Sequence, residues 1–372
     1  MLALISAAPM FGNLSSFFWN RLASARPKIS FAVTLQALTI ACVLTIAVAP
    51  TTQPGVALLV GTVVLSRLLI TGIITVRSVV WSLNYPRSQR ARTTGQLQII
   101  TSLVTVAISS GVGPLLDSDP GAFRWVYACG GLFGLLGVIF FAQVRVPGEK
   151  RQRVLERRHS RITDGSQGFL GILRHDRNFA HYQFNQFLAG CANMLLEAPL
   201  VFLVTRELQA SYTVSIAVTM VIPFTISVIT LPIWARFLDR VHVTEFRARQ
   251  SILWIVSQLI LWFGAFTGSL LWIGISRGVL GVARGGGALA WQLGHNDFAP
   301  QDQLASYMGV HVTLTGVRGA TAPFLGMLLY VGWEQFPGIG HQLFLLAALL
   351  SSASWLGYRR LHQRMAAASQ SP

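Results

Sequence analysis

Six charged side chains lie inside apolar stretches of this sequence that are long enough to cross a lipid bilayer. One is a carboxylate, Glu197, and five are guanidinium groups: Arg67, Arg77, Arg277, Arg284 and Arg318. A charge in such a stretch is costly unless it faces a cavity or a partner. These six side chains are therefore the first places to look for chemistry.

Polar residues in the stretch 180–204 repeat at the spacing of a helix. Residues one or more turns apart lie on the same side of an α-helix, and this spacing aligns Tyr182, Gln186, Asn193 and Glu197. A desolvated carboxylate can exchange a proton near neutral pH. Glu197 is accordingly a candidate for proton coupling or for contact with a cationic substrate. A fixed ion pair with a membrane arginine is the structural alternative.

The arginines favour a substrate that carries a carboxylate or another anionic group, because a guanidinium offers a planar pair of donors. Arg277, Arg284 and Arg318 are predicted to line the pathway of substrate or protons. The alternative is that some arginines cap neighbouring helices or hold helices together. That structural role is favoured for Arg67, and Arg77 is expected to extend toward the lipid headgroups.

One histidine lies on the polar face of the stretch 304–330, in line with Thr315 and Arg318. An imidazole can pass protons between neighbours because it titrates near neutral pH. His311 is therefore included in the predicted pathway, with a packing role as its alternative. Nothing in the sequence resembles a catalytic triad, a metal-ligand spacing or a phosphate-binding loop. We expect no enzyme, no cofactor and no metal.

Composition determines which elements can carry these residues. The 372 residues are 52% hydrophobic and 11% charged, with a mean hydropathy of +0.54, whereas a soluble domain carries about a quarter charged residues. Only helices and closed barrels satisfy their backbone in lipid, and barrel strands would read as short alternating segments. The predicted fold class is an all-α polytopic membrane protein. Its spans are expected at residues 1–18, 29–49, 55–80, 95–116, 123–143, 180–204, 212–235, 250–267, 269–290, 304–330 and 339–358.

Basic residues alternate between the connectors of these spans. Of the 29 Lys and Arg residues, 22 fall in the stretches 20–28, 86–92, 145–178, 236–249 and 359–364, and the other connectors hold only two. By the positive-inside rule, these five stretches and the C-terminus lie in the cytoplasm of a multi-pass cell-membrane protein. The net charge of +16 then reports topology and contact with anionic lipids, not a nucleic-acid surface.

The chain contains an internal repeat. Ser66-Arg67 precedes Trp81 at the same spacing at which Ser276-Arg277 precedes Trp291. The two copies lie 210 positions apart, from Arg67 to Arg277. A repeat of this length in a membrane protein indicates two related halves around a shared polar path.

Several motifs in this frame resemble the major facilitator superfamily of secondary transporters. That family has a basic loop after its second helix, of the form Gly-x-Leu-a-Asp-Arg-x-Gly-Arg-Arg. Here Leu22, Ala23 and Lys28 match it, while Asn20, Ser24 and Pro27 depart from it. The second copy keeps the acid–base pair as Asp239-Arg240. Arg67 followed by Thr71 and Gly72, and Gly113-Pro114, are similar to further family features in the fourth and fifth helices.

The resemblance implies an N-terminal half at 1–144, a cytoplasmic linker at 145–179 and a C-terminal half at 180–372. Aligning the repeat leaves the stretch 180–204 without a counterpart in the first half. The family has six helices per half, so the chain is expected to lack the family's first transmembrane helix and to form family helices 2–12. A start codon assigned too late is favoured over an eleven-helix form. Arg67, Asp239 and Arg240 take structural or coupling roles by this resemblance.

The resemblance also implies a function. We expect a monomeric secondary transporter of a small organic solute, driven by protons through rocking of the two halves. A small organic anion and an amphipathic metabolite are the two substrate candidates. A drug/proton antiporter is one alternative, which is weakened because Gly113-Pro114 runs into Leu115-Leu116-Asp117 instead of the glycines of that group. A non-transporting membrane scaffold or sensor is the other.

Overall fold

The computed structural model describes residues 2–23, 26–50, 52–85, 87–151, 153–154, 169–300 and 304–370. These residues are almost entirely helical. The central part of the predicted linker, residues 155–168, and Ser24 of the first loop motif lie outside the described residues.

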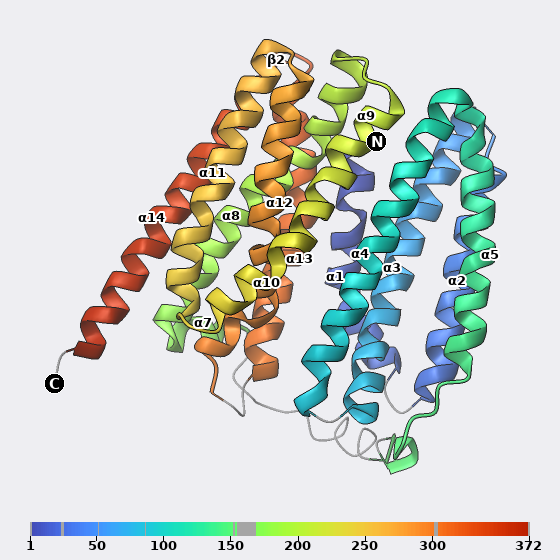
Figure 1. Ribbon diagram of the computed structural model, residues 1–372. Helices are drawn as coiled ribbons and strands as arrows, with labels where there is room; N and C mark the ends of the chain where they lie inside the picture. Colours follow the sequence, from blue (N-terminus) through green and yellow to red (C-terminus); the bar gives the residue numbers. More distant parts are fainter. Residues whose placement is uncertain are drawn as a thin grey trace. The chain divides into compact units, whose positions relative to one another are not determined.

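The described elements fall into two compact units. The first comprises Ala3–Ile100 and Ser118–Ser166, and the second comprises Thr101–Asp117 and Gln167–Pro372. Residues 101–117 thus belong to the second unit, although the repeat assigns them to the N-terminal half. The long helices of each unit run side by side along its length (Figure 1).

The helices of the N-terminal part are long and are joined by short connectors. They are α1 (Leu2–Ala23), α2 (Lys28–Ala47), α3 (Gln53–Asn84), α4 (Arg87–Ser118), the 3₁₀ turn η1 (Pro120–Ala122) and α5 (Phe123–Ala142). Proline marks the start of α3, where its missing N–H costs nothing.

The second unit contains more elements. They are α7 (Phe169–His175), α8 (Arg177–Phe202), the π-helix η2 (Leu203–Glu207), α9 (Tyr212–Ile216), the π-helix η3 (Ala217–Val221), α10 (Ile222–Leu238), α11 (Val243–Thr267), α12 (Leu270–Leu293), the 3₁₀ turn η4 (Gly294–Asp297), α13 (Leu304–Val331) and α14 (Gln342–Gln370). The two short antiparallel strands β1 (Gly332–Trp333) and β2 (Phe336–Pro337) turn the chain between α13 and α14.

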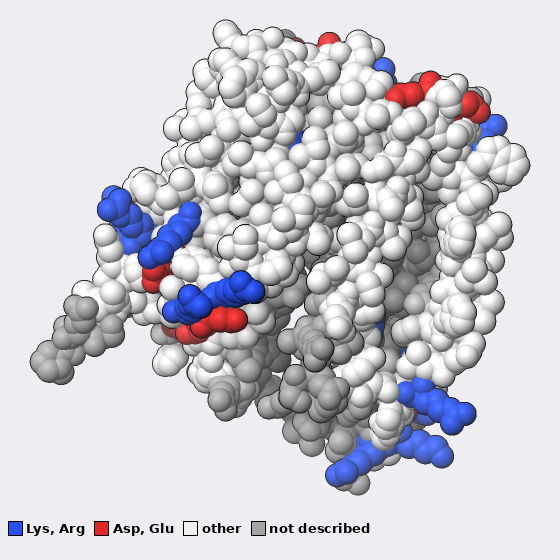
Figure 2. Space-filling model, viewed as in Figure 1, with Lys and Arg blue, Asp and Glu red and all other residues white. Residues whose placement is uncertain are grey.

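A described helix covers most of each of the eleven predicted spans. Within the described residues, eight helical stretches are long and apolar enough to cross a membrane. The chain is therefore a multi-pass helical membrane protein, and the total of eleven spans stays a prediction. Figure 2 shows that the middle of each unit carries almost no charge on the face in view, while Lys and Arg side chains gather toward one end.

Two cores hold the second unit together. One is aliphatic and aromatic, around Leu203, Leu261 and Phe344. The other lies at the end where α8 begins and α14 ends, and Phe179 and Phe246 are among its fully buried aromatic residues. Burying such side chains excludes lipid and water from the helix contacts, so the polar residues among them are held in fixed positions.

Side-chain carboxylates cap two helices in this unit. Asp176 accepts a hydrogen bond from the backbone N–H of Phe179 at 2.8 Å and begins α8. Asp117, from the end of α4, accepts from the backbone N–H groups of Tyr212 and Thr213 at 2.6 and 3.0 Å. It thereby satisfies donors that α9 leaves free at its first turn.

The internal repeat is visible in the packing of each unit. In the first, the Trp19 ring lies against Gly72 of α3, so closely that a Cβ on Gly72 would stand 2.8 Å from the indole. In the second, the Trp234 indole N–H donates to the carbonyl of Val282 in α12 at 2.7 Å. Gly72 and Val282 are 210 positions apart, as are the two repeated arginines. A tryptophan of the earlier helix therefore packs against the same repeat position of the later helix in both units, although Trp19 and Trp234 themselves lie 215 positions apart.

Glycines of α12 allow α10 to approach closely. A Cβ on Gly281 would lie 2.8 Å from the Ile226 Cβ and 2.9 Å from the Pro223 carbonyl oxygen. Gly285 is similarly close to Ser227 O and Thr230 Oγ1, at 2.8 and 2.7 Å. Small residues at such contacts let membrane helices pack closely. Gly274 lies seven residues before Gly281 on α12, and no atom of the described residues lies within 4 Å of its Cβ position.

Replacing Gly281 by leucine is expected to lower the apparent melting temperature of the detergent-solubilised protein by several degrees. The added side chain must displace the α10 backbone, and overpacking of this kind costs roughly 1–3 kcal/mol. Gly274→Leu is the matched control on the same helix and should leave the melting temperature within error of the wild type. Equal losses from the two substitutions would mean that the α10–α12 contact does not set the effect, because leucine forms helices more readily than glycine.

Candidate functional site

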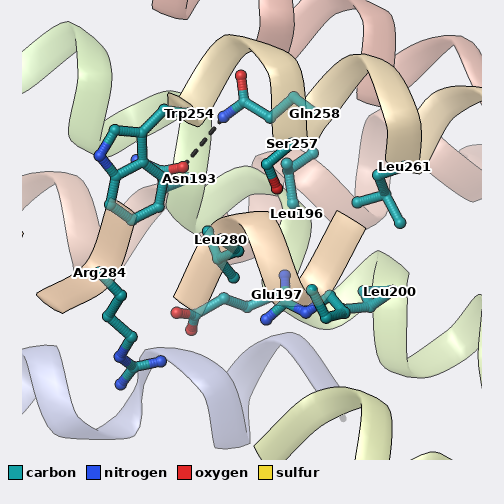
Figure 3. Close-up of a pocket in the computed structure, with 11 residues that line it drawn as sticks. Asn193, Leu196, Glu197, Leu200, Trp254, Ser257, Gln258, Leu261, Leu280 and Arg284 are labelled. Atoms are coloured by element: carbon teal, nitrogen blue, oxygen red, sulfur yellow. Dashed lines mark hydrogen bonds between the residues drawn. The ribbon is translucent and has the colours of Figure 1, made fainter. Parts of the chain in front are cut away.

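A polar pocket of about 160 Å³ lies within the second unit, between α8, α11 and α12 (Figure 3). Its charged lining residues are Glu197, Arg277 and Arg284. The other lining residues are Asn193, Leu196, Leu200, Trp254, Ser257, Gln258, Leu261 and Leu280. Four of the predicted pathway residues, Asn193, Glu197, Arg277 and Arg284, are thus brought together in one cavity.

A pair of carboxamides closes one side of the pocket. The Gln258 Nε2 group donates to Asn193 Oδ1 at 3.0 Å, as the dashed line in Figure 3 shows. Asn193 Nδ2 in turn donates to the Ala189 carbonyl at 2.9 Å. The Oε1 atom of Gln258 is buried and has no hydrogen-bond partner among the residues that the structure describes. This side of the pocket therefore holds an acceptor that a donor group of a solute could satisfy.

Glu197 is exposed to open space beside the pocket. Its carboxylate interacts electrostatically with Arg277 and Arg284. Within the described part of the chain, however, Glu197 forms no salt bridge with either arginine. The structural alternative of a fixed ion pair is therefore not seen in this geometry.

Arg277 is held by a backbone carbonyl that the local helix geometry leaves free. The π-helix η3 directs the N–H of Ile222 to the carbonyl of Ala217, five residues back. The next residue, Pro223, has no N–H to offer to Val218. Arg277 Nε donates to the Val218 carbonyl oxygen at 3.3 Å instead. Anchoring through Nε leaves the two terminal nitrogens of the guanidinium available for a ligand.

Arg284 is positioned by an aromatic ring. Its guanidinium carbon lies 4.2 Å from the centroid of the Phe224 ring, which is a cation–π distance. Phe224 and Val218 belong to the same continuous segment, from η3 into α10. One segment thus positions both arginines without a carboxylate, and their positive charge remains available to the pocket.

The other predicted pathway residues form a separate group. Gln186, His311 and Arg318 are buried and do not line the pocket. Arg318 donates to the carbonyl of Gln186, and His311 shares a hydrogen bond with Gln183 at 3.1 Å. Gln186 and Asn193 share a helical face but meet different neighbours, because packed helices cross at an angle.

Three residues with predicted structural or coupling roles lie outside both groups. Arg67 is exposed within the first unit, and Asp239 and Arg240 are exposed at the end of α10. Among the described residues, none of the three has a salt bridge. Arg77, predicted to reach toward the headgroups, lies over the Trp81 ring at 4.7 Å.

The sequence reasoning missed the residues that α11 contributes. It began this span at residue 250 and placed Arg247 in a cytoplasmic connector, whereas α11 begins at Val243 and buries the Arg247 side chain. Gln258 and Trp254 were also missed. An uncharged amide in the middle of an apolar segment is the signal that would have indicated Gln258.

The sequence model of the family described as Major Facilitator Superfamily matches residues 1–323. The chain belongs to the major facilitator superfamily. No curated protein sequence matches the chain.

Solved structures of transporters in this superfamily share the fold. A crystal structure of the nucleoside transporter NupG aligns over 97% of this chain and 90% of its own, with a TM-score of 0.68 and 11% identity. A mutant of the same transporter aligns with a TM-score of 0.70 at equal coverage and identity. A D-xylose–proton symporter aligns over 96% of this chain and 85% of its own, with a TM-score of 0.68 and 13% identity. At these identities the likeness shows the fold, which is that of superfamily transporters.

Proposed function

We propose that the protein is a proton-coupled secondary transporter of a small organic anion. One observation carries this proposal. Arg277 and Arg284 are positioned by a backbone carbonyl and an aromatic ring, so neither is neutralised by a carboxylate salt bridge. Two such guanidinium groups in a pocket favour a ligand with a carboxylate or a comparable anionic group.

Glu197 supplies the proposed proton site. A carboxylate beside two arginines competes with an anionic substrate for the same positive charge. Protonation of Glu197 would leave both arginines to the substrate, and release of the proton would favour substrate departure. Binding of the proton and of the substrate are thereby linked, which is the requirement for symport.

Placement in the membrane follows from the charges. We propose that the ends of each unit rich in Lys and Arg face the cytoplasm, with the C-terminus on that side of the cell membrane. The transporter would act as a monomer, with its two halves rocking about the substrate site. The N-terminal half at 1–144, the linker at 145–179 and the C-terminal half at 180–372 remain the proposed division.

Uptake by proteoliposomes tests the function. Purified protein would be assayed against a panel of small carboxylates, sugars, nucleosides and organic cations, with and without an inward proton gradient. We expect accumulation of one or more carboxylates that depends on the gradient. Export of cations against protons would instead identify a drug antiporter, and no transport of any class would favour the scaffold or sensor.

A further inference from the structure

A second polar cluster lies in the second unit, apart from the pocket. It joins Tyr182, Gln183 and Gln186 of α8, Arg247 of α11, His311 and Arg318 of α13, and Tyr358 of α14; the name arginine cluster is used for these seven residues. All seven are buried, and the two arginines are 6% and 4% exposed. Each side chain of the cluster is therefore surrounded by protein.

The two guanidinium groups of the arginine cluster act on the same neighbours. Arg247 and Arg318 interact electrostatically with each other and with His311 and both tyrosines. The tyrosine rings are themselves in contact, with centroids 5.8 Å apart. Two positive charges thus converge on one buried region.

Only neutral acceptors satisfy the arginine cluster in this structure. Arg318 donates to the Gln186 carbonyl, and Arg247 Nη1 donates to Gln250 Oε1 at 3.0 Å. The Gln186 side-chain oxygen accepts from the Tyr358 hydroxyl at 2.7 Å. Neither arginine has a salt bridge within the described residues.

Among the described residues, the neighbouring carboxylates form no salt bridge with either arginine of the cluster. Asp297 interacts with Tyr182, but its carboxylate accepts from the Val243 backbone N–H at 2.7 Å. Asp176 accepts from Phe179 N–H and from the Tyr307 hydroxyl, at 2.8 and 3.1 Å. Burial lowers the pKa of the His295 imidazole, which keeps that side chain neutral near pH 7.

Among the described residues, several buried donors in the arginine cluster have no hydrogen bond of good geometry, although Arg247 lies beside the Tyr182 hydroxyl. They are Nε and Nη2 of Arg247, Nε of Arg318 and Nε2 of Gln183. A guanidinium cannot lose its proton in a protein, so burial cannot neutralise it. An uncompensated buried charge is strongly unfavourable, and the surplus here consists of donors and positive charge.

We propose that the arginine cluster binds a small inorganic anion, for which chloride is the probe. An anion accepts hydrogen bonds from the free guanidinium and amide donors and offsets the two charges. Enclosure by buried side chains favours a compact, monovalent ion over an organic solute. The anion would hold α8, α11, α13 and α14 together through a single buried charge.

The experiment compares chloride with gluconate at constant ionic strength. Thermal unfolding of the purified protein in detergent should shift upward with chloride and saturate, as expected for a ligand that binds the folded state. Saturable binding of radioactive chloride to the wild type, measured in parallel, should give the same midpoint. This second measurement does not depend on any variant.

Two variants locate the ion. Arg247→Gln should abolish the saturable chloride effect, whereas Arg284→Gln, which alters the pocket, should retain it. Loss of chloride binding in Arg284→Gln alone would place the anion in the pocket and overturn the proposal. No saturable binding to the wild type, or stabilisation that follows ionic strength alone, would also overturn it. If Arg247→Gln does not fold, Arg318→Lys is the second variant. It keeps the positive charge but lacks the planar set of guanidinium donors, and it should weaken chloride binding by at least several-fold.

Discussion

Replacing Glu197 by glutamine is expected to abolish proton-driven accumulation of the substrate. Glutamine keeps the size and polarity of the side chain but cannot exchange a proton. A gradient of one pH unit is worth about 1.4 kcal/mol, or about tenfold accumulation for one proton per substrate molecule. The variant should therefore lose roughly that tenfold concentration ratio in proteoliposomes with such a gradient.

Exchange of labelled for unlabelled substrate across the same vesicles provides the internal comparison. Exchange needs the pocket and the conformational change but no net proton movement, so Glu197→Gln should retain it. Glu245→Gln is the matched control, because Glu245 pairs with the exposed Arg249 away from the pocket. Full accumulation by Glu197→Gln would show that this carboxylate is not the proton site.

Substituting Arg277 or Arg284 by glutamine is expected to raise the KM for the transported anion by about ten- to a hundredfold. Hydrogen bonds to charged groups contribute roughly 1.5–3 kcal/mol, which corresponds to a change of this size. Each arginine is anchored by a different contact, so the two losses should be separable. Initial rates of uptake over a range of substrate concentrations measure the effect.

An uncharged amide analogue of the substrate distinguishes a charge contact from a packing defect. Competition by the amide should be weak in the wild type and little changed in either variant. Arg249→Gln, on the exposed face of α11, should leave the KM unaltered. If neither pocket variant changes the KM, the transported group is bound elsewhere and the anion proposal is wrong.

Much of the fold could be predicted because its signals are physical and periodic. Three signals could be recognised from sequence position alone. They are the length of the apolar stretches, the alternation between connectors rich and poor in basic residues, and the repetition of the Arg67 segment at Arg277. Helical spacing also identified Asn193 and Glu197 as neighbours, and both line the pocket. Local periodicity is enough for residues that share one helix.

Contacts between helices were less predictable. The face of α8 that carries Gln186 and Glu197 meets different helices along its length. Polar residues that share one helical face therefore belong to two separate sites, the arginine cluster and the pocket. Arg247 resembled a topogenic charge because only tertiary packing shows that it is buried. No periodic pattern in the sequence indicates that the Val218 carbonyl accepts a hydrogen bond from Arg277.

The π-helix before α10 has a consequence for how this segment tolerates change. A single π turn corresponds to one residue more than a regular α-helix would need. Removing one residue from 219–221 would let this turn close as a regular α-helix, so α10 would keep nearly the same rotational phase. Pro223 would then stand four residues after Val218, and the Val218 carbonyl would still lack a helical donor. The acceptor that holds Arg277 is thus kept free by the proline, so this segment should tolerate loss of the extra residue better than replacement of Pro223.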